Sequence, residues 1–242
     1  MTHSWHSGRR VPFLDTLTPD ARAALTELGG GPQTFSAGEV LIEEGEDRQE
    51  LWFLHRGKVK VTCLLGRGRA WLMDVKGAGD VVGEVAVMDS GPRSATVVAS
   101  TEVVATVVSW RDLQPFFRSH PDALHALYQV LGDRLRTSDR RRMEFGAYPV
   151  MVRLARILVE LALTYGKQGR NATRIDVNLS QPEYADLIGS RTNTVHKALA
   201  ALREAELITT GERQTHVQDL TELRKTARLS VPTGRRRRHR SA

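Results

Sequence analysis

The spacing of hydrophobic positions changes along the chain, and its first part consists of short β-rich runs. Between residues 35 and 109 these runs, such as the Val-Val pairs at 97–98, 103–104 and 107–108, are separated by glycines. Glycine supplies the backbone angles of tight turns, so the pattern predicts many short strands that close into a sandwich or barrel. We therefore expect an N-terminal β-domain that ends near residue 120.

The pattern then becomes helical. Apolar residues recur at spacings of three and four: Leu124, Leu127, Leu131 and Leu135. This period predicts one long helix over residues 121–145. Its apolar stripe is narrow, which favours pairing with a second copy of the chain; the alternative is a helix that packs back on the β-domain. Pro149 interrupts the period, and another helix is predicted over residues 150–163.

A helix-turn-helix pattern follows. Two short helices fit residues 181–188 and 192–204, with the small residues Ala185 and Gly189 near their crossing. The buried faces are expected to be Tyr184, Leu187 and Ile188 in the first helix and Val195, Leu199 and Leu202 in the second. Residues 207–217 have the pattern of strand, turn and strand. A hairpin directly after the second helix is typical of the wing of a winged helix, which we place over residues 149–223.

The polar face of the second helix carries groups that can hydrogen-bond base edges and phosphates. An amide can pair with adenine, and an ammonium with guanine or the backbone. The predicted DNA-binding residues are Ser180, Gln181, Arg191, Thr192, Asn193, Thr194, His196 and Lys197. The alternative is an amphipathic helical hairpin whose polar face is only solvated.

Charged residues are distributed unevenly between the two halves of the chain. The formal net charge is +7, but residues 1–120 hold 13 Lys and Arg against 15 Asp and Glu, while residues 121–242 hold 22 against 13. Such asymmetry suggests that the C-terminal half meets a polyanion. Residues 228–242 include Arg235 to Arg238 and Arg240 and are expected to form a disordered basic tail. The tail is either an arm that adds salt-sensitive DNA affinity or a solvated chain end.

Composition excludes several classes of protein. At 242 residues with 40% apolar content, the chain can bury the cores of two modest domains. It has no apolar run of membrane-spanning length and no signal peptide, so a cytoplasmic location is expected. The single cysteine, Cys63, offers no internal disulfide or metal cluster. A metal-dependent cupin enzyme would need clustered His ligands, and the β-domain core offers only His55, so we expect neither a metal site nor an enzyme.

Residues 83–95 form a second group of chemically related positions. A turn of helix after Gly83 would leave backbone N–H groups free for an anion, and Arg93 would neutralise a phosphate. Glu84 could then accept hydrogen bonds from vicinal sugar hydroxyls. These are the requirements of a ribose phosphate. The alternative is an ordinary ion pair between Glu84 and Arg93 on a sheet.

The order of β-domain, long helix and winged helix resembles the cyclic AMP receptor and fumarate-nitrate reductase regulator (CRP/FNR) family of bacterial transcription factors. The resemblance covers residues 13–223. It rests on residues 35–41 (FSAGEVL) with Gly45, residues 51–54 (LWFL) with Gly57, residues 79–84 (GDVVGE), and Arg93-Ser94-Ala95. It implies a mixed α+β fold with an N-terminal cyclic-nucleotide-binding-like β-roll (jelly roll), a dimerisation helix and a C-terminal winged helix-turn-helix.

The resemblance also implies a ligand site. Glu84 would hold the ribose 2′-hydroxyl, Arg93 and the Ser94 backbone the cyclic phosphate, and Gly83 would admit close backbone approach. Val85 belongs to the same implied site. The adenine-contacting positions of the long helix fall on Ser138 and Asp139. Asp139 lacks the expected hydroxyl, so the effector could be cyclic AMP, cyclic GMP, another nucleotide or none.

The predicted DNA-binding helix of this chain departs from the family pattern. The family often has Arg-Glu and a later Arg where this chain has Thr192, Asn193 and Lys197. The operator is therefore expected to differ from the family's well-known palindrome. The implied molecule is a homodimer that binds double-stranded DNA, requires no cofactor, responds to a small effector and acts with RNA polymerase. The alternatives are a regulator whose pocket binds no cyclic nucleotide, and a cyclic-nucleotide-binding subunit that acts on a protein partner.

Overall fold

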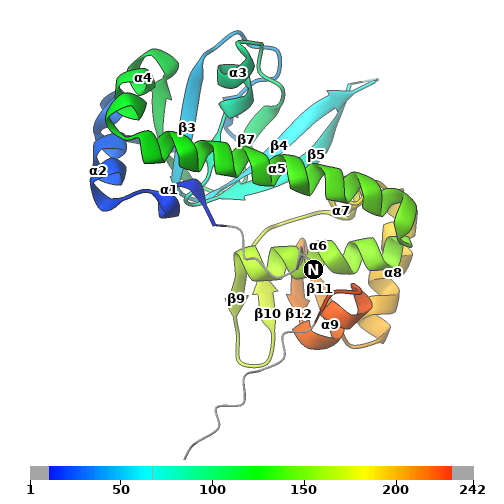
Figure 1. Ribbon diagram of the computed structural model, residues 1–242. Coiled ribbons are helices and arrows are strands. Elements are labelled where there is room, and N and C mark those ends of the chain that lie inside the picture. The colour runs from blue at the N-terminus through cyan, green and yellow to red at the C-terminus, as the bar shows by residue number, and fades with distance from the viewer. Residues whose placement is uncertain (1–10, 67, 231–242) are drawn as a thin grey trace, which may run out of the picture. The chain divides into compact units, whose positions relative to one another are not determined.

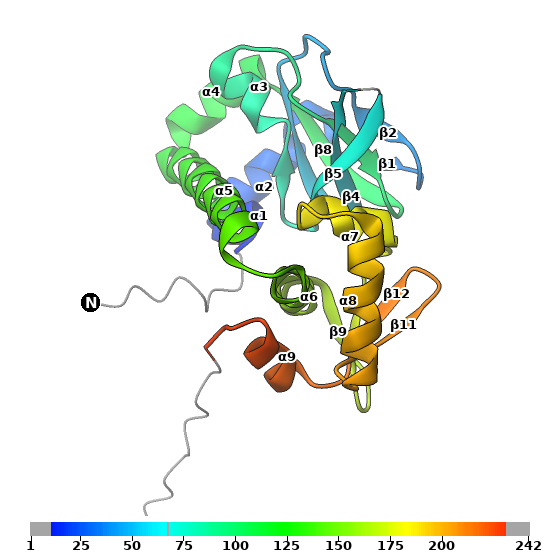
Figure 2. The same cartoon turned by 90° about the vertical axis from the view of Figure 1, so that its right-hand side faces the viewer.

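The computed structural model describes residues 11–66 and 68–230. These residues form two compact units. The first consists of Val11–Gly146 together with Pro182–Gly189, and the described part of the second consists of Ala147–Gln181 together with residues 190–230. Figures 1 and 2 show the elements of both units.

Eight strands of the first unit build two antiparallel four-stranded sheets. The first sheet has the order β1 (Pro32–Phe35), β8 (Val103–Ser109), β3 (Glu50–Arg56) and β6 (Val81–Val82). The second sheet has the order β2 (Val40–Ile42), β7 (Thr96–Ala99), β4 (Lys58–Leu65) and β5 (Arg69–Gly77). The predicted β-roll is therefore confirmed.

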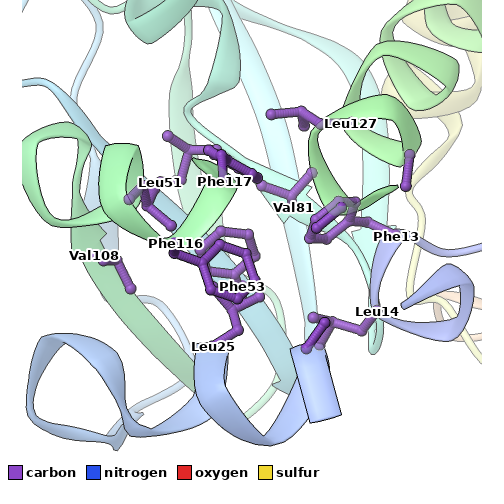
Figure 3. Close-up of a cluster of buried hydrophobic side chains, with 14 of the residues drawn as sticks. Phe13, Leu14, Leu25, Leu51, Phe53, Val81, Val108, Phe116, Phe117 and Leu127 are labelled. Atoms are coloured by element: carbon purple, nitrogen blue, oxygen red, sulfur yellow. The ribbon is translucent and has the colours of Figure 1, made fainter. Parts of the chain in front are cut away.

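Strand β3 contributes side chains to two hydrophobic clusters, one on each of its faces. Side chains alternate between the two faces of a strand, and both faces of β3 are buried. Leu51 and Phe53 point into a cluster that also contains residues of the helices (Figure 3), whereas Trp52 and Leu54 enter the core of the β-roll. A strand buried on both faces has a continuous apolar sequence rather than an alternating one. This accounts for the run Leu-Trp-Phe-Leu at residues 51–54.

Helices cover the outer face of the first sheet. The helical elements of residues 11–146 are α1 (Phe13–Thr16), α2 (Pro19–Glu27), the 3₁₀ turn η1 (Leu28–Gly30), α3 (Glu84–Asp89), α4 (Trp110–Ser119) and α5 (Pro121–Ala147). Two of them begin at hydroxyl caps. Thr18 accepts a hydrogen bond from the Ala21 amide at the start of α2, and Ser109 accepts one from the Asp112 amide at the start of α4.

The apolar stripe of helix α5 is buried in its first turns and exposed to solvent farther along. Its first turns are buried in the cluster of Figure 3 through Leu127 and Val130, which lie against the β-roll. Tyr128, between these two buried residues, is 55% exposed, and farther along the helix Leu135 is 65% exposed and Met143 is 66% exposed. The packing of the stripe on the β-domain is therefore confirmed for the first half of the helix, and the second half leaves an apolar stripe on the surface.

The second unit holds a small sheet and the remaining helices. Its sheet has the order β11 (Ile208–Gly211), β12 (Gln214–Val217), β10 (Thr173–Ile175) and β9 (Gly166–Gln168). The helices are α6 (Val150–Tyr165), α8 (Thr192–Glu204) and α9 (Leu220–Thr226), while α7 (Gln181–Leu187) lies mainly in the first unit. The predicted wing is β11 and β12. Strands β9 and β10 were not predicted, because three residues are too few to establish an alternating pattern.

The structure bears on three further expectations, which concern a membrane span, a metal site and the basic tail, only within the described residues. Across residues 11–66 and 68–230, no helix is both long enough and apolar enough to cross a bilayer. In the same ranges, no three His, Cys, Asp or Glu side chains gather as metal ligands would. The arginines of the expected basic tail lie outside the described residues. Residues 228–230 are described, and Arg224 donates to the Ser230 carbonyl there.

Candidate functional site

The segment predicted to bind a phosphate begins at a left-handed glycine. Gly83 has φ of +86° and lies immediately before α3, whose first residue is Glu84. A Cβ atom at Gly83 would stand 2.6 Å from Arg93 Nη1 and 2.9 Å from the Glu50 carbonyl oxygen. Only glycine satisfies both the backbone angle and this space. The glycine therefore lets the Arg93 guanidinium lie directly on the backbone.

Arg93 is a buried cation that uses only some of its hydrogen-bond donors. Its Nη1 donates to the carbonyl oxygens of Glu50 and Gly83, both at 2.9 Å, and only 3% of the residue is exposed. Nε and Nη2 are buried and donate no hydrogen bond within the described residues. The Glu50 carboxylate is 3.7 Å from Nη2. Burial lowers the pKa of Arg93, and Glu50 partly offsets this effect. Unused buried N–H groups of a cation favour an anion.

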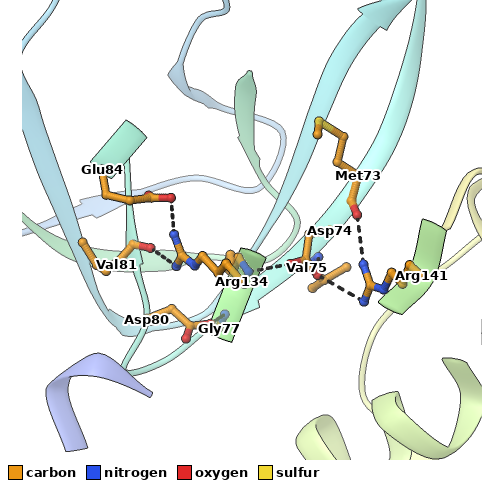
Figure 4. A network of polar contacts seen from close by, with 10 residues as sticks. Met73, Asp74, Val75, Gly77, Asp80, Val81, Glu84, Arg134 and Arg141 are labelled. Carbon is orange, nitrogen blue, oxygen red and sulfur yellow. Dashed lines mark hydrogen bonds and ion pairs between the residues drawn. The ribbon is translucent and has the colours of Figure 1, made fainter. Parts of the chain in front are cut away.

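Glu84 pairs with a residue that the sequence interpretation did not assign. Its carboxylate accepts from Arg134 Nη1 of α5, and Arg134 Nη2 donates to the Val81 carbonyl at 2.5 Å (Figure 4). The expected alternative of an ion pair between Glu84 and Arg93 is therefore wrong. Burial alone would lower the pKa of Arg134, but Glu84, with Asp80 and Asp74 nearby, raises it above its ordinary value.

Other charged groups continue this network along β5. Arg141 Nη1 of α5 donates to the Met73 carbonyl at 3.3 Å, and its Nη2 lies 3.9 Å from Asp74 (Figure 4). Asp74 also accepts from Lys76 at 2.5 Å. The sequence held one signal for Arg134, because it lies one helical turn before Ser138 and so shares a face of α5. Nothing in the sequence indicated the partners of Arg141.

The remaining predicted ligand residues have mixed surroundings. Ser94 is exposed beside Arg93, and Val85 is 41% exposed on α3. Ser138 is exposed on α5. Asp139 is half-buried and accepts from Arg142 Nη2 at 3.1 Å. The structure therefore brings Gly83, Glu84 and Arg93 together. Within the described residues, none of these three makes a hydrogen bond or an ion pair with Ser138 or Asp139.

The predicted DNA-binding segment has the expected local structure. Gly189 has φ of +58° after α7, and α8 begins at Thr192. The apolar residues expected to be buried are buried: Tyr184, Leu187, Ile188, Val195, Leu199 and Leu202. The exposed predicted residues are Arg191, Asn193, Thr194, His196 and Lys197, and the half-buried ones are Ser180, Gln181 and Thr192. Gln181 Oε1 and His196 Nδ1 are 3.2 Å apart.

Comparisons with known proteins agree with both halves of this description. The model of the cyclic nucleotide-binding domain matches residues 32–120, and that of the Crp-like helix-turn-helix domain matches residues 152–226. A "CRP-like cAMP-activated global transcriptional regulator" of Mycobacterium tuberculosis is 31% identical over 219 residues, which are 90% of this chain and 97% of that protein.

Two relatives from Thermus thermophilus extend the comparison. Transcriptional regulator LdrP is 32% identical over 193 residues, which cover 80% of this chain and 95% of that protein. The crystal structure of a CRP-family transcriptional regulator superposes with a TM-score of 0.69 at 28% identity, covering 82% of this chain and 97% of that one.

The β-roll, the long helix and the helix-turn-helix define a DNA-binding transcription regulator with a cyclic nucleotide-binding domain. The chain belongs to the CRP/FNR family of transcription regulators. The family consists of regulators rather than enzymes, so the cupin interpretation is excluded. The helix-turn-helix match likewise favours the DNA-binding interpretation over a regulatory subunit that acts on a protein partner.

Proposed function

We propose that this regulator is a homodimer that reads a palindromic operator and responds to a cyclic nucleotide held by residues 83–94. The observation that carries the ligand assignment is the buried Arg93 guanidinium, whose Nε and Nη2 make no hydrogen bond within the described residues. A cyclic phosphate would accept from these two donors. Glu84 would hold a ribose hydroxyl, and the exposed Ser94 would place its backbone N–H at the phosphate.

Cyclic AMP is the first candidate among the effectors. The Mycobacterium tuberculosis relative is named as cAMP-activated, and it aligns with 90% of this chain. In the proposed site, Val85 lines the sugar side, and Ser138 and Asp139 lie toward the base. RNA polymerase is the proposed protein partner, because the relatives are named as transcription regulators and such proteins act at promoters.

Calorimetric titration tests the effector assignment. Cyclic AMP or cyclic GMP should bind the wild type, and Arg93→Ala should lower the affinity about 10-fold to 150-fold, since a hydrogen bond to a charged group contributes roughly 1.5–3 kcal/mol. Arg93 also holds two backbone carbonyls. A thermal melt of Arg93→Ala, together with the milder Arg93→Lys, separates lost binding from lost folding.

Arg48→Ala is the matched control for this titration. Arg48 lies two residues after Glu46, whose carbonyl accepts a hydrogen bond from the Arg93 amide. Its side chain is 65% exposed and, among the contacts of the described chain, pairs only with Glu46 at 3.8 Å. Its removal should leave the affinity unchanged. Binding of neither nucleotide to the wild type would contradict the effector assignment and leave the DNA assignment intact.

A regulator that answers to another signal is the second candidate. Two observations favour it: Arg134 already pairs with Glu84, and Asp139, where a hydroxyl was expected, pairs with Arg142. A site with internal partners for these carboxylates can be stable without a nucleotide. The same titration decides between the two candidates.

Two substitutions, one in the first turn of α8 and one at the residue before the helix, separate base reading from phosphate contact. Loss of the amide in Asn193→Ala should cost about 1–3 kcal/mol and relax specificity at one base pair, where we propose that it pairs with adenine. Arg191→Ala should weaken binding to all sequences alike and reduce the slope of log K against log salt by about 1. Both are measured by fluorescence anisotropy on duplexes selected by the wild type from a randomised pool. Unchanged binding of Asn193→Ala to every single-base variant would contradict its assignment.

A further inference from the structure

The first helix of the helix-turn-helix packs with the β-roll. Residues 152–226 match the helix-turn-helix model, yet Pro182–Gly189 within that range form one compact unit with Val11–Gly146. Figure 2 shows α7 directly beside β4 and β5. One segment of chain therefore belongs by sequence to the DNA-binding domain and by packing to the sensor.

Asp186 is the centre of this contact. Only 4% of its side chain is exposed. One carboxylate oxygen accepts from Arg69 Nη2, and the other accepts from the Leu72 amide at 3.2 Å. The Trp71 indole donates to the Asp186 carbonyl at 3.3 Å. A buried carboxylate is tolerated only when its oxygens are satisfied, so the partners on β5 hold this helix at one position.

A β-bulge makes the amide of Leu72 available. Val61 of β4 faces Asp74 of β5, but the next residue, Thr62, faces Leu72, so Met73 is an extra residue in β5. A bulge removes backbone groups from the ladder of the sheet. Here the freed groups have specific partners. The Leu72 N–H donates to Asp186, and the Met73 carbonyl accepts from Arg141 of α5. One irregularity of β5 thus contacts both α7 and α5.

Two more contacts fix the segment. Lys60 Nζ of β4 lies 2.5 Å from Glu183 Oε1, and both side chains are largely buried, at 18% and 24% exposure. At the other end, a Cβ on Gly189 would stand 2.9 Å from the ring of Phe145, near the end of α5. The turn before α8 therefore lies against Phe145 of α5, while the helix before the turn is held by contacts with β4 and β5.

We propose that Asp186 is a positioning residue for DNA reading, because it fastens the first helix of the helix-turn-helix to the β5 bulge. The base-reading helix α8 begins six residues after Asp186. Base contacts require placement of side chains within fractions of an ångström, whereas phosphate contacts tolerate displacement. Loosening Asp186 therefore lowers sequence-specific affinity more than non-specific affinity, and it weakens the dependence of binding on the distance between half-sites.

A charge-swap experiment on the full-length protein tests this role. The variants are Arg69→Glu, Asp186→Arg and the two combined, with Arg56→Glu as the matched control because Arg56 is an exposed arginine of the β-roll that pairs with Glu102. The first readout is binding to duplexes selected by the wild type, with half-site spacing changed by single base pairs. The second is hydrogen exchange at the amides of residues 184–189, which needs no DNA.

Each single variant should lose about tenfold in specific affinity with a smaller loss on unrelated DNA, should exchange faster in α7 and should bind altered spacings with less discrimination. The combined variant should recover only the part of the loss that comes from the pair with Arg69, because an arginine at position 186 has no acceptor for the Leu72 amide. Arg56→Glu should behave as the wild type does. If a charge variant does not fold, Trp71→Phe, which removes only the indole donor, is measured in its place by DNA binding and by hydrogen exchange.

Three results would overturn the proposal: unchanged exchange and spacing preference in the single variants, equal loss on specific and unrelated DNA, or no recovery in the combined variant. A wild type that selects no duplex would instead contradict DNA binding itself, and the exchange measurement would still test whether Arg69 and the β5 bulge hold α7.

Discussion

Leu135→Glu is expected to convert the dimer into monomers and to lower affinity for a two-half-site operator about 10²-fold to 10⁴-fold. Leu135 is the most exposed leucine of α5, at 65%, and it follows Tyr128 by seven residues. In a twofold dimer of parallel helices the two copies of this position face each other. Two carboxylates there repel, and the second half-site is then no longer bound within one molecule.

The same charge placed elsewhere on α5 is the control. Gln129→Glu also adds one carboxylate at an exposed position, but six residues of helix turn it about 120° away from Leu135. Sedimentation equilibrium measures the mass of each variant, and anisotropy measures the affinity for one and two half-sites. A dimeric Leu135→Glu protein with full operator affinity would contradict the assignment of this stripe to dimerisation.

Leu51→Ala should destabilise the β-roll by about 2–5 kcal/mol. Leu51 is 0% exposed on β3 and packs among Phe53 and the helical residues of the cluster in Figure 3. Removing three carbon atoms there leaves a cavity that a sheet buried on both faces closes poorly. Urea unfolding followed by circular dichroism gives the free energy of unfolding.

Leu64→Ala makes the identical chemical change at a surface position of β4. Its side chain is 57% exposed, so the cost should stay within about 0.5 kcal/mol. The difference between the two variants therefore measures burial rather than the loss of leucine as such. Equal costs would mean that the side chain of Leu51 is not part of a packed core.

Local patterns were enough to predict the elements that contain a long or chemically distinctive signal. The helix over Thr192–Glu204 was predicted with the bounds that the structure gives, because its apolar residues keep one period and Gly189 marks the turn before it. Gly83 and Arg93 were predicted to lie together, and the glycine is required because the guanidinium occupies the space of a side chain.

Contacts between distant segments could not be predicted in this way. Arg134 lies 50 residues after Glu84, and the arginines near the end of α5 all have the same sequence signal, so periodicity cannot choose which one reaches the carboxylate. The bulge at Met73 depends on how β4 and β5 pair, and its effect on Asp186 depends on a helix more than 110 residues away. Short strands such as β9 fail for a different reason, since three residues carry too little pattern.

The ion pair between Glu84 and Arg134 has a consequence for sensitivity in the cell. An effector that has to displace Arg134 from the Glu84 carboxylate binds only the fraction of molecules in which this ion pair is open, and each tenfold decrease in that fraction raises the apparent Kd tenfold, or about 1.4 kcal/mol. The concentration at which such a regulator switches is therefore adjusted by a side chain of α5 that need not touch the effector. Evolution could retune the threshold of the response while the residues that recognise the signal stay the same.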